Sequence, residues 1–184
     1  LNNCTVISNS AANGGGACSN SLNGCTLNYN WTTAAHPLGH GGGAYFGTLN
    51  DCSLTGNGAT YGGGTSWSTL KRCKLMENSA TQGGGANGCE LNNCLLADNE
   101  ALLGGGAAYG VLDNCTLAGN YAIENDGNEG NGGGAFYGVL KNCTLTGNWA
   151  STSGSGAYFA NLTNCIVYFN YDADYTGGTL AYCC

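Results

Sequence analysis

Apolar and polar positions recur along this chain with a period of about 21 residues. One unit reads L-x-N-C-T-L-x-x-N-x-A-x-x-G-G-G-A-x-x-x-x, so that a leucine, a cysteine and a second apolar residue are separated by polar ones. The cysteine and the apolar residue after it alternate with the period of two that is typical of a strand. A fixed period of about 20 to 50 residues indicates a solenoid, in which each unit forms one coil of a stack.

Two polar or weakly polar slots recur in every unit. The cysteine slot holds Cys4, Cys25, Cys52, Cys73, Cys94, Cys115, Cys143 and Cys165. The asparagine slot, five residues later, holds Asn9, Asn30, Asn57, Asn78, Asn99, Asn120, Asn148 and Asn170. Stacked coils would set equivalent residues about 4.8 Å apart. We therefore expect each amide to hydrogen-bond the amides above and below it, as in asparagine ladders.

The second half of the unit decides between two kinds of solenoid. The first half also fits a leucine-rich repeat, whose convex side needs a helical segment. In this chain the second half of the unit is a glycine triplet, an alanine and four further residues. Each glycine in a helix costs about 1 kcal/mol. The pattern therefore favours an all-β parallel β-helix solenoid of about eight coils, built from two or three short strands per coil. Residues 1–184 are expected to form one domain, as part of a longer array or as a fibre subunit.

Composition and charge narrow the functional classes. The 184 residues include 34 glycines, 12 cysteines and a single proline, and the net charge is −7 with only four basic residues. Phosphate binding depends on lysine and arginine, so nucleic acid and anionic lipid surfaces are not expected partners. No stretch of the sequence is long and apolar enough to be a membrane span.

Two units carry insertions, around residues 35–40 and 123–131, and both fall between the asparagine slot and the glycine triplet. We expect both loops to leave the same corner about 19 Å apart, and insertions on one face of a solenoid often form a binding surface. The second insertion offers Glu124, Asp126 and Glu129, whose oxygens suit calcium. His36 and His40 in the first insertion could also bind a metal.

Four cysteines lie outside the regular slot: Cys18, Cys89, Cys183 and Cys184. We interpret Gly177-Gly178 as a degraded glycine triplet, which places Cys184 in the leucine slot of a ninth unit. Cys183 and Cys184 could then link to a further copy of the chain in an oxidising compartment. The regular cysteines can be buried thiols or disulfide-bonded neighbours. Stacked Cα atoms have the right separation for a disulfide, but parallel side chains aim poorly at one another.

The basic residues Lys71, Arg72 and Lys74 are the candidate catalytic bases of a polysaccharide lyase. Asp51 occupies the slot of Arg72 one coil earlier, so a cross-coil ion pair on an exposed turn explains the same residues.

The two short motifs of the unit resemble the repeats of the chlamydial polymorphic membrane proteins. They are [LV]-x-x-N, as in Val6-Ile7-Ser8-Asn9 and Leu54-Thr55-Gly56-Asn57, and G-G-A, as in Gly15-Gly16-Ala17. Leucine or valine stands here where that family has phenylalanine. The resemblance implies a right-handed parallel β-helix in the passenger region of a secreted or cell-surface adhesin, with no catalytic residues.

The expected function is therefore that of a structural and adhesive segment without a cofactor, except calcium if the acidic loop binds it. Its expected partners are further copies of itself, stacked head to tail into a fibre, or host and cell-surface glycans or proteins. The rival interpretation is a polysaccharide-active β-helix enzyme, either lyase or hydrolase, or a carbohydrate-binding module.

Overall fold

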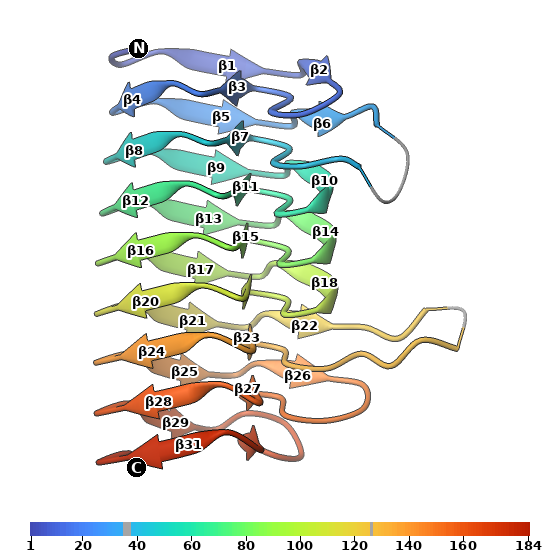
Figure 1. Cartoon of the computed structure of the whole chain (residues 1–184), viewed down its shortest axis with the longest axis vertical. Helices are drawn as coiled ribbons and strands as arrows, with labels where there is room; N and C mark the ends of the chain where they lie inside the picture. The colour runs from blue at the N-terminus through green and yellow to red at the C-terminus, as the bar shows by residue number, and fades with distance from the viewer. Residues whose placement is uncertain (35–37, 126) are drawn as a thin grey trace.

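The protein is an all-β parallel solenoid, as the sequence predicts. The computed structural model describes residues 1–34, 38–125 and 127–184. Every pair of named strands is parallel, and each strand pairs with its equivalents in the coils before and after it. Figure 1 shows the resulting stack, with the N-terminus at one end and the C-terminus at the other. No helix long and apolar enough to cross a membrane occurs in the part of the chain that the structure describes.

Each regular coil has four sides rather than the two or three strands expected, and the sides form four sheets, numbered here in chain order. Sheet I contains β1 (Thr5–Ile7), β5 (Thr26–Asn28), β9 (Ser53–Thr55), β13 (Lys74–Met76), β17 (Leu95–Ala97), β21 (Thr116–Ala118), β25 (Thr144–Thr146) and β29 (Ile166–Tyr168). Sheet II contains β2 (Ser10–Ala11), β6 (Trp31–Thr32), β10 (Gly58–Tyr61), β14 (Ser79–Gln82), β18 (Glu100–Leu103), β22 (Tyr121–Ala122) and β26 (Trp149–Ala150).

The other two sheets close the coil. Sheet III contains β3 (Ala17–Cys18), β7 (Ala44–Tyr45), β11 (Thr65–Ser66), β15 (Ala86–Asn87), β19 (Ala107–Ala108), β23 (Ala135–Phe136), β27 (Ala157–Tyr158) and β30 (Tyr175–Thr176). Sheet IV contains β4 (Ser21–Asn23), β8 (Thr48–Asn50), β12 (Thr69–Lys71), β16 (Glu90–Asn92), β20 (Val111–Asp113), β24 (Val139–Lys141), β28 (Asn161–Thr163) and β31 (Thr179–Ala181). In Figure 1 sheet IV lies in front and runs leftward, whereas sheet I lies behind and runs rightward as the chain descends, so the coil is right-handed.

The four sides arise because left-handed backbone recurs at four corners of the coil. In the third coil these corners are Asp51, Gly56, Gly62 and Trp67, with φ between 52° and 66°. Only glycine adopts this conformation without strain, and asparagine and aspartate tolerate it better than most residues. Three corners accept other residues, but the corner after sheet II is glycine in every coil that has a glycine triplet or its Gly154 counterpart.

The core is a narrow column of stacked identical side chains. Leucines of sheet IV pair with leucines, as Leu49 does with Leu70, and the apolar residues of sheet I do the same, as Leu54 does with Leu75. These leucines are fully buried, and burying one such side chain contributes about 1.5–3 kcal/mol. Alanines such as Ala44 and Ala86 fill the narrow side under sheet III.

The asparagine slot forms a continuous hydrogen-bonded ladder along the stack. The backbone N–H and the Nδ2 of Asn57 both donate to Oδ1 of Asn78, at 2.9 and 3.0 Å. The same Nδ2 also donates to the carbonyl oxygen of Leu27, in the coil before, at 2.8 Å. Asn30, Asn57, Asn78, Asn99, Asn120 and Asn148 are fully buried. Each amide thus satisfies polar groups that would otherwise be buried without partners.

The glycine triplet is explained by its contact with this ladder. A Cβ atom on Gly43, the third glycine of its triplet, would lie 3.2 Å from the Asn57 amide carbon and 2.6 Å from the carbonyl oxygen of Gly64. The backbone of the triplet therefore approaches the next coil too closely for any side chain. The first glycine has a different role, because Gly41 sits at a corner with φ of 62°.

The last coil is shorter than the repeat predicts, which corrects the expected register there. Leu180 pairs with Leu162 and Tyr175 pairs with Ala157, so Leu180 rather than Cys184 occupies the leucine slot. Gly177 and Gly178 are not a glycine triplet, because they follow β30 rather than precede it. Asp174 takes the place of the next ladder residue: its Oδ1 accepts hydrogen bonds from the backbone N–H and the Nδ2 of Asn170 at 3.0 and 2.9 Å.

We predict that removing one whole unit, Leu70–Glu90, leaves a folded solenoid that is one coil shorter, because solenoid stability is a sum over neighbouring coils. Leu96→Asp should instead destabilise the protein by more than about 4 kcal/mol, since it buries an unpaired charge. Circular dichroism and urea unfolding would measure both. A deletion one residue shorter, Leu70–Cys89, is the matched control, because it shifts every later residue by one slot. Unfolding by the 21-residue deletion as complete as that by Leu96→Asp would contradict the repeat interpretation.

Candidate binding sites: a groove and an aromatic ridge

The two insertions border a groove on the outer face of sheet II. Both leave the corner after sheet II, as expected, and Figure 1 shows them projecting from the same side of the stack. Between them lie the three strands β10, β14 and β18. The groove has a volume of about 730 Å³ and is lined by residues of β6, of these three strands and of both insertions, among them Ala34 and Asn128. Ligand pockets commonly have about 300–1,000 Å³.

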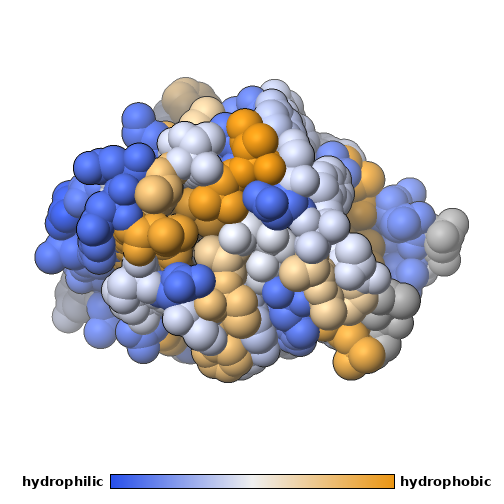
Figure 2. Space-filling view, turned by 90° about the horizontal axis from the view of Figure 1, so that it is seen from above, coloured by the Kyte–Doolittle hydropathy of each residue, from blue (hydrophilic) through white to orange (hydrophobic). Residues whose placement is uncertain are grey.

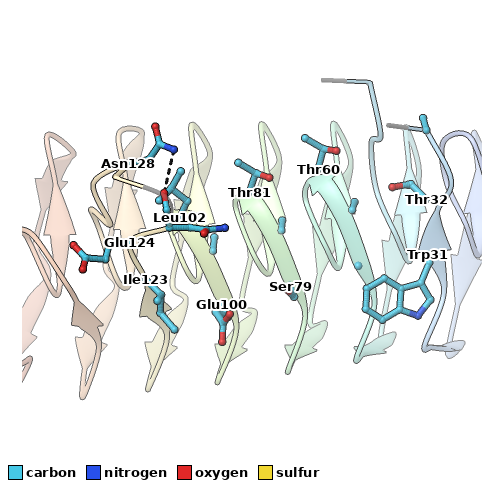
Figure 3. Close-up of a pocket in the computed structure, with 16 residues that line it drawn as sticks. Trp31, Thr32, Thr60, Ser79, Thr81, Glu100, Leu102, Ile123, Glu124 and Asn128 are labelled. Atoms are coloured by element: carbon cyan, nitrogen blue, oxygen red, sulfur yellow. Dashed lines mark hydrogen bonds between the residues drawn. The ribbon is translucent and has the colours of Figure 1, made fainter. Parts of the chain in front are cut away.

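The floor of this groove is flat and carries small side chains. Its three strands have four residues each, whereas the other strands of sheet II have two. Equivalent positions lie in register: Gly58 beside Ser79 and Ser79 beside Glu100, then Ala59 beside Ala80 and Ala80 beside Ala101. In Figure 3, Thr60, Thr81 and Leu102 follow one edge of the floor, and Ser79 and Glu100 follow the opposite edge.

The wall at the N-terminal end of the groove is an aromatic side chain. The ring of Trp31 lies over Gly58 of the next coil, where a Cβ atom would overlap it. Half of the Trp31 surface stays exposed. Figure 3 shows the ring extending from β6 toward the floor strands. The first insertion is held at its return by Gly39, whose carbonyl oxygen accepts hydrogen bonds from the backbone N–H groups of Thr60 and Tyr61.

The charge of the groove is acidic. Among the described residues that line it, Glu100 and Glu124 are acidic and none is basic. Figure 3 shows the Glu124 carboxylate turned away from the floor, whereas Glu100 stands on it. The described part of the groove therefore offers one carboxylate, several hydroxyl groups and one aromatic ring.

The second insertion contains the candidate calcium ligands. Glu124 is held through its backbone N–H, which donates to Ser151 Oγ at 2.9 Å, and Glu129 Oε2 accepts a hydrogen bond from Asn131 Nδ2 at 3.3 Å. Asp126 lies outside the described residues, as does His36 of the other insertion. Within residues 1–34, 38–125 and 127–184, no three histidine, cysteine or acidic side chains gather where they could hold a metal ion.

The corner between sheets III and IV carries an exposed row of aromatic side chains, which we call the aromatic ridge: Phe46, Trp67, Tyr109, Tyr137 and Phe159. All five residues have φ between 48° and 55° and are between 41% and 56% exposed. The rings of Tyr109 and Tyr137 stack with centroids 5.8 Å apart, and those of Tyr137 and Phe159 with centroids 5.7 Å apart.

Glycine interrupts this row once, and the neighbouring ring compensates. Gly88 occupies the corner between Trp67 and Tyr109. The Trp67 ring lies over it, so close that a Cβ atom on Gly88 would be only 3.1 Å from the ring. The sequence shows these aromatics between the glycine triplet and the next leucine in several units. Their exposure and their shared corner depend on the register of the stack. The recurrence of an aromatic residue two positions after the buried alanine is the signal that could have identified the ridge.

The predicted cross-coil ion pair is present. Arg72 donates from Nε and Nη2 to the two carboxylate oxygens of Asp51 at 2.7 and 2.6 Å. This hydrogen bonding, together with the guanidinium charge, lowers the pKa of the Asp51 carboxyl below its usual value. Both side chains are about half exposed. Arg72, one of the candidate bases of a lyase, is therefore engaged in this ion pair. An ion pair at such exposure contributes little to stability.

The regular cysteines form a second ladder of free thiols. All twelve cysteines are unpaired. The backbone N–H of Cys73 donates to Cys94 Sγ at 3.4 Å, and Cys94 repeats this contact with Cys115 at 3.4 Å. Cys183 continues the ladder, because its Sγ accepts a hydrogen bond from the Cys165 backbone N–H at 3.4 Å. Cys183 therefore lies in the regular cysteine slot and not, as the sequence indicates, outside it. Of the two last cysteines, Cys184 is the exposed one.

The remaining two cysteines have different environments. Cys89 is buried at the corner between sheets III and IV, where its Sγ accepts a hydrogen bond from the Ser68 backbone N–H at 3.4 Å. Burial raises the pKa of the Cys89 thiol to about 12. Cys18 lies on the outer face of sheet III beside Tyr45 and is exposed.

Comparison with known proteins gives no family for the chain: no protein-family description and no curated protein matches it. Among solved structures, it is similar to full-length QnrB1, a plasmid-mediated fluoroquinolone resistance protein. That match has a TM-score of 0.40 and 10% identity, and covers 98% of this chain and 92% of that one. A trypsin-treated form of QnrB1 matches with a TM-score of 0.41 and 16% identity, covering 94% of this chain and 91% of that one. The solenoid assignment rests on the strand pairing described above.

We predict that only a few thiols react with iodoacetamide in the native protein. Cys18 and Cys184 should be alkylated rapidly, whereas Cys89 and the buried ladder thiols should react only after denaturation, because burial disfavours the thiolate that is the nucleophile. Mass spectrometry of peptides from native and denatured samples would measure this. Alkylation of native Cys115 as fast as that of Cys18 would show that the column is open to solvent.

Proposed function

We propose that this chain is a structural and adhesive solenoid segment of a secreted or cell-surface protein, which uses the aromatic ridge to contact a partner surface. The observation that carries the proposal is the row of exposed aromatic rings at one corner of the stack. Aromatic residues are enriched at protein interfaces and supply most of the binding energy at their centres. A contiguous exposed apolar patch marks an interaction site more often than scattered apolar residues do.

The backbone at the ridge supports a role in binding rather than in stability. A side chain with Cβ in the left-handed region costs about 1–2 kcal/mol relative to glycine. Glycine takes this conformation at Gly88 in the same corner, and at Gly56 and Gly119 in the corner after sheet I. The ridge therefore keeps bulky rings where glycine would be less strained, and such strain tends to persist at functional positions.

The secreted or cell-surface location is supported by the motifs [LV]-x-x-N and G-G-A that resemble the chlamydial repeats. These motifs occupy places that any solenoid of this geometry would fill in the same way: asparagine for the ladder, glycine for the close approach of coils and alanine for the narrow side. We therefore propose the adhesin class and not membership of the chlamydial family. Cell-surface proteins and glycans are the proposed partners.

Assembly between copies is part of the same proposal. Figure 2 looks along the stack onto the first coil and shows hydrophobic residues near the middle of that face. Val6 and Cys4 are only partly buried there, as Val167 and Tyr175 are in the last coil. Further coils, whether of the same chain or of another copy, would bury these side chains and pair the outer strands.

We predict that removing two ridge rings abolishes adhesion without unfolding the protein. In Tyr109→Gly/Tyr137→Gly, relief of backbone strain should offset the lost ring stacking, so that the free energy of unfolding changes by about 1 kcal/mol or less. The measurements are binding of protein-coated beads to cultured cells and urea unfolding.

The matched control for this double variant is Tyr29→Gly/Phe169→Gly. These residues also have positive φ and are exposed, but they lie at the corner after sheet I. The control should adhere as the native protein does. Equal adhesion by the ridge variant and the native protein would contradict the adhesive role of the ridge.

We also predict that the purified chain forms filaments at high concentration, and that oxidation lengthens them through the exposed Cys184. Electron microscopy with and without reductant would measure filament length, with Cys184→Ser as the control that removes the effect of oxidation. Monodisperse monomers in both conditions would exclude head-to-tail assembly.

A further inference from the structure

We infer that the groove between the two insertions is a binding site for an uncharged oligosaccharide chain. This site lies on sheet II and shares no residue with the aromatic ridge, so the inference goes beyond the proposed adhesive function. It rests on the shape of the floor, on the chemistry of the lining and on the exclusion of other ligand classes.

The groove is built by a local change in the coil. The sheet II strands lengthen from two residues to four only at β10, β14 and β18, between the two coils that carry insertions. The C-terminal end of each insertion pairs with one of these strands: His40 pairs with Tyr61, and Asn131 pairs with Leu103. Strands β6 and β22 are four coil steps apart, which is about 19 Å at normal strand spacing. An open trough of this length fits a short chain of rings better than a single small molecule.

The lining has the groups that recognise sugars. Trp31 offers an exposed aromatic face at the end of the floor, and the apolar C–H face of a pyranose ring packs on such a surface. Thr60, Ser79 and Thr81 bring hydroxyl groups to the lining. A hydroxyl both donates and accepts, as sugar hydroxyls do, and Glu100 adds a strong acceptor. Ala59, Ala80 and Ala101 leave room between these groups.

Other ligand classes fit the groove less well. A polyanion, such as a polyuronate or a nucleic acid, would meet Glu100 and no basic side chain among the described lining residues. An extended peptide adds to a sheet edge, but the backbone groups of β10, β14 and β18 are already bonded to the adjacent coils. A helix needs a deep apolar groove, whereas this floor is lined mostly with alanine, serine and threonine, beside Leu102 and Glu100.

The test measures binding of defined hexasaccharides to the whole chain by isothermal titration calorimetry. The probes are neutral hexasaccharides of glucose, xylose and N-acetylglucosamine, together with the cationic glucosamine hexamer and the anionic galacturonate hexamer. We expect at least one neutral hexamer to bind and the galacturonate hexamer not to bind. Binding of the glucosamine hexamer alone would replace the uncharged ligand by a cationic one and overturn the inference, as would binding of the galacturonate hexamer alone or of no hexamer.

Variants locate the binding. Trp31→Ala should weaken it at least tenfold, and Ser79→Arg should abolish it, because the new side chain would project over the floor from β14, its middle strand. The matched control is Trp67→Ala, because Trp31 and Trp67 are both 52% exposed but Trp67 belongs to the ridge. Glu90→Gln on sheet IV is the control for Glu100→Gln, which should weaken binding more moderately.

Each variant is first checked for the native circular dichroism spectrum. Unchanged affinity in both Trp31→Ala and Ser79→Arg would place binding outside the groove and overturn the inference. Adhesion by the ridge is measured separately with Tyr109→Gly/Tyr137→Gly, so failure of one site leaves the other open to test.

Discussion

Every feature of this protein depends on the pairing of each coil with the next in strict register. Parallel strands at about 4.8 Å place each side chain directly over its equivalent in the coil before. A polar side chain that recurs at the same buried position of every coil can then be satisfied by its own equivalents in the coils before and after. Asparagine is satisfied in this way, since Asn57 donates to Asn78 and accepts from Asn30. Leucine, cysteine and alanine need no such partner, because their apolar side chains stack on their equivalents in a buried column.

The corners of the coil differ in which side chains they can hold. A left-handed residue is required at each corner, and glycine meets this need with the least strain. At the corner after sheet II the choice is fixed, because a side chain there would collide with its own coil: a Cβ atom on Gly62 would overlap the carbonyl oxygen of Thr65. At the corner between sheets III and IV there is room outside the stack, so aromatic residues can stand there. Their rings lean over the next coil, as Trp67 does over Gly88. The chemical character of the solenoid surface is therefore set mainly by the side chains at its corners.

The groove arises where the repeat departs from its standard length. Two insertions leave the same corner and separate three coils from the rest of sheet II, and in those coils the strands are longer. The regular coils supply a rigid, flat floor, and the insertions supply the walls. Trp31 belongs to the repeat and not to an insertion, yet it becomes a wall because its ring lies over Gly58. A groove on a solenoid can thus form from ordinary repeat positions between two irregular segments.

The sequence by itself determined the solenoid, its period, the buried columns and the corner from which the insertions leave, because each depends only on spacing along the chain. It did not determine the number of sides, since four corners become visible only through left-handed φ at residues such as Asp51 and Trp67. It also misplaced the last coil, where counting put Cys184 in the leucine slot. Strand pairing places Leu180 there, and Asp174 substitutes for a ladder asparagine. The groove and the aromatic ridge were decided only by the tertiary structure, because side chains about 21 residues apart become neighbours only when the coils stack.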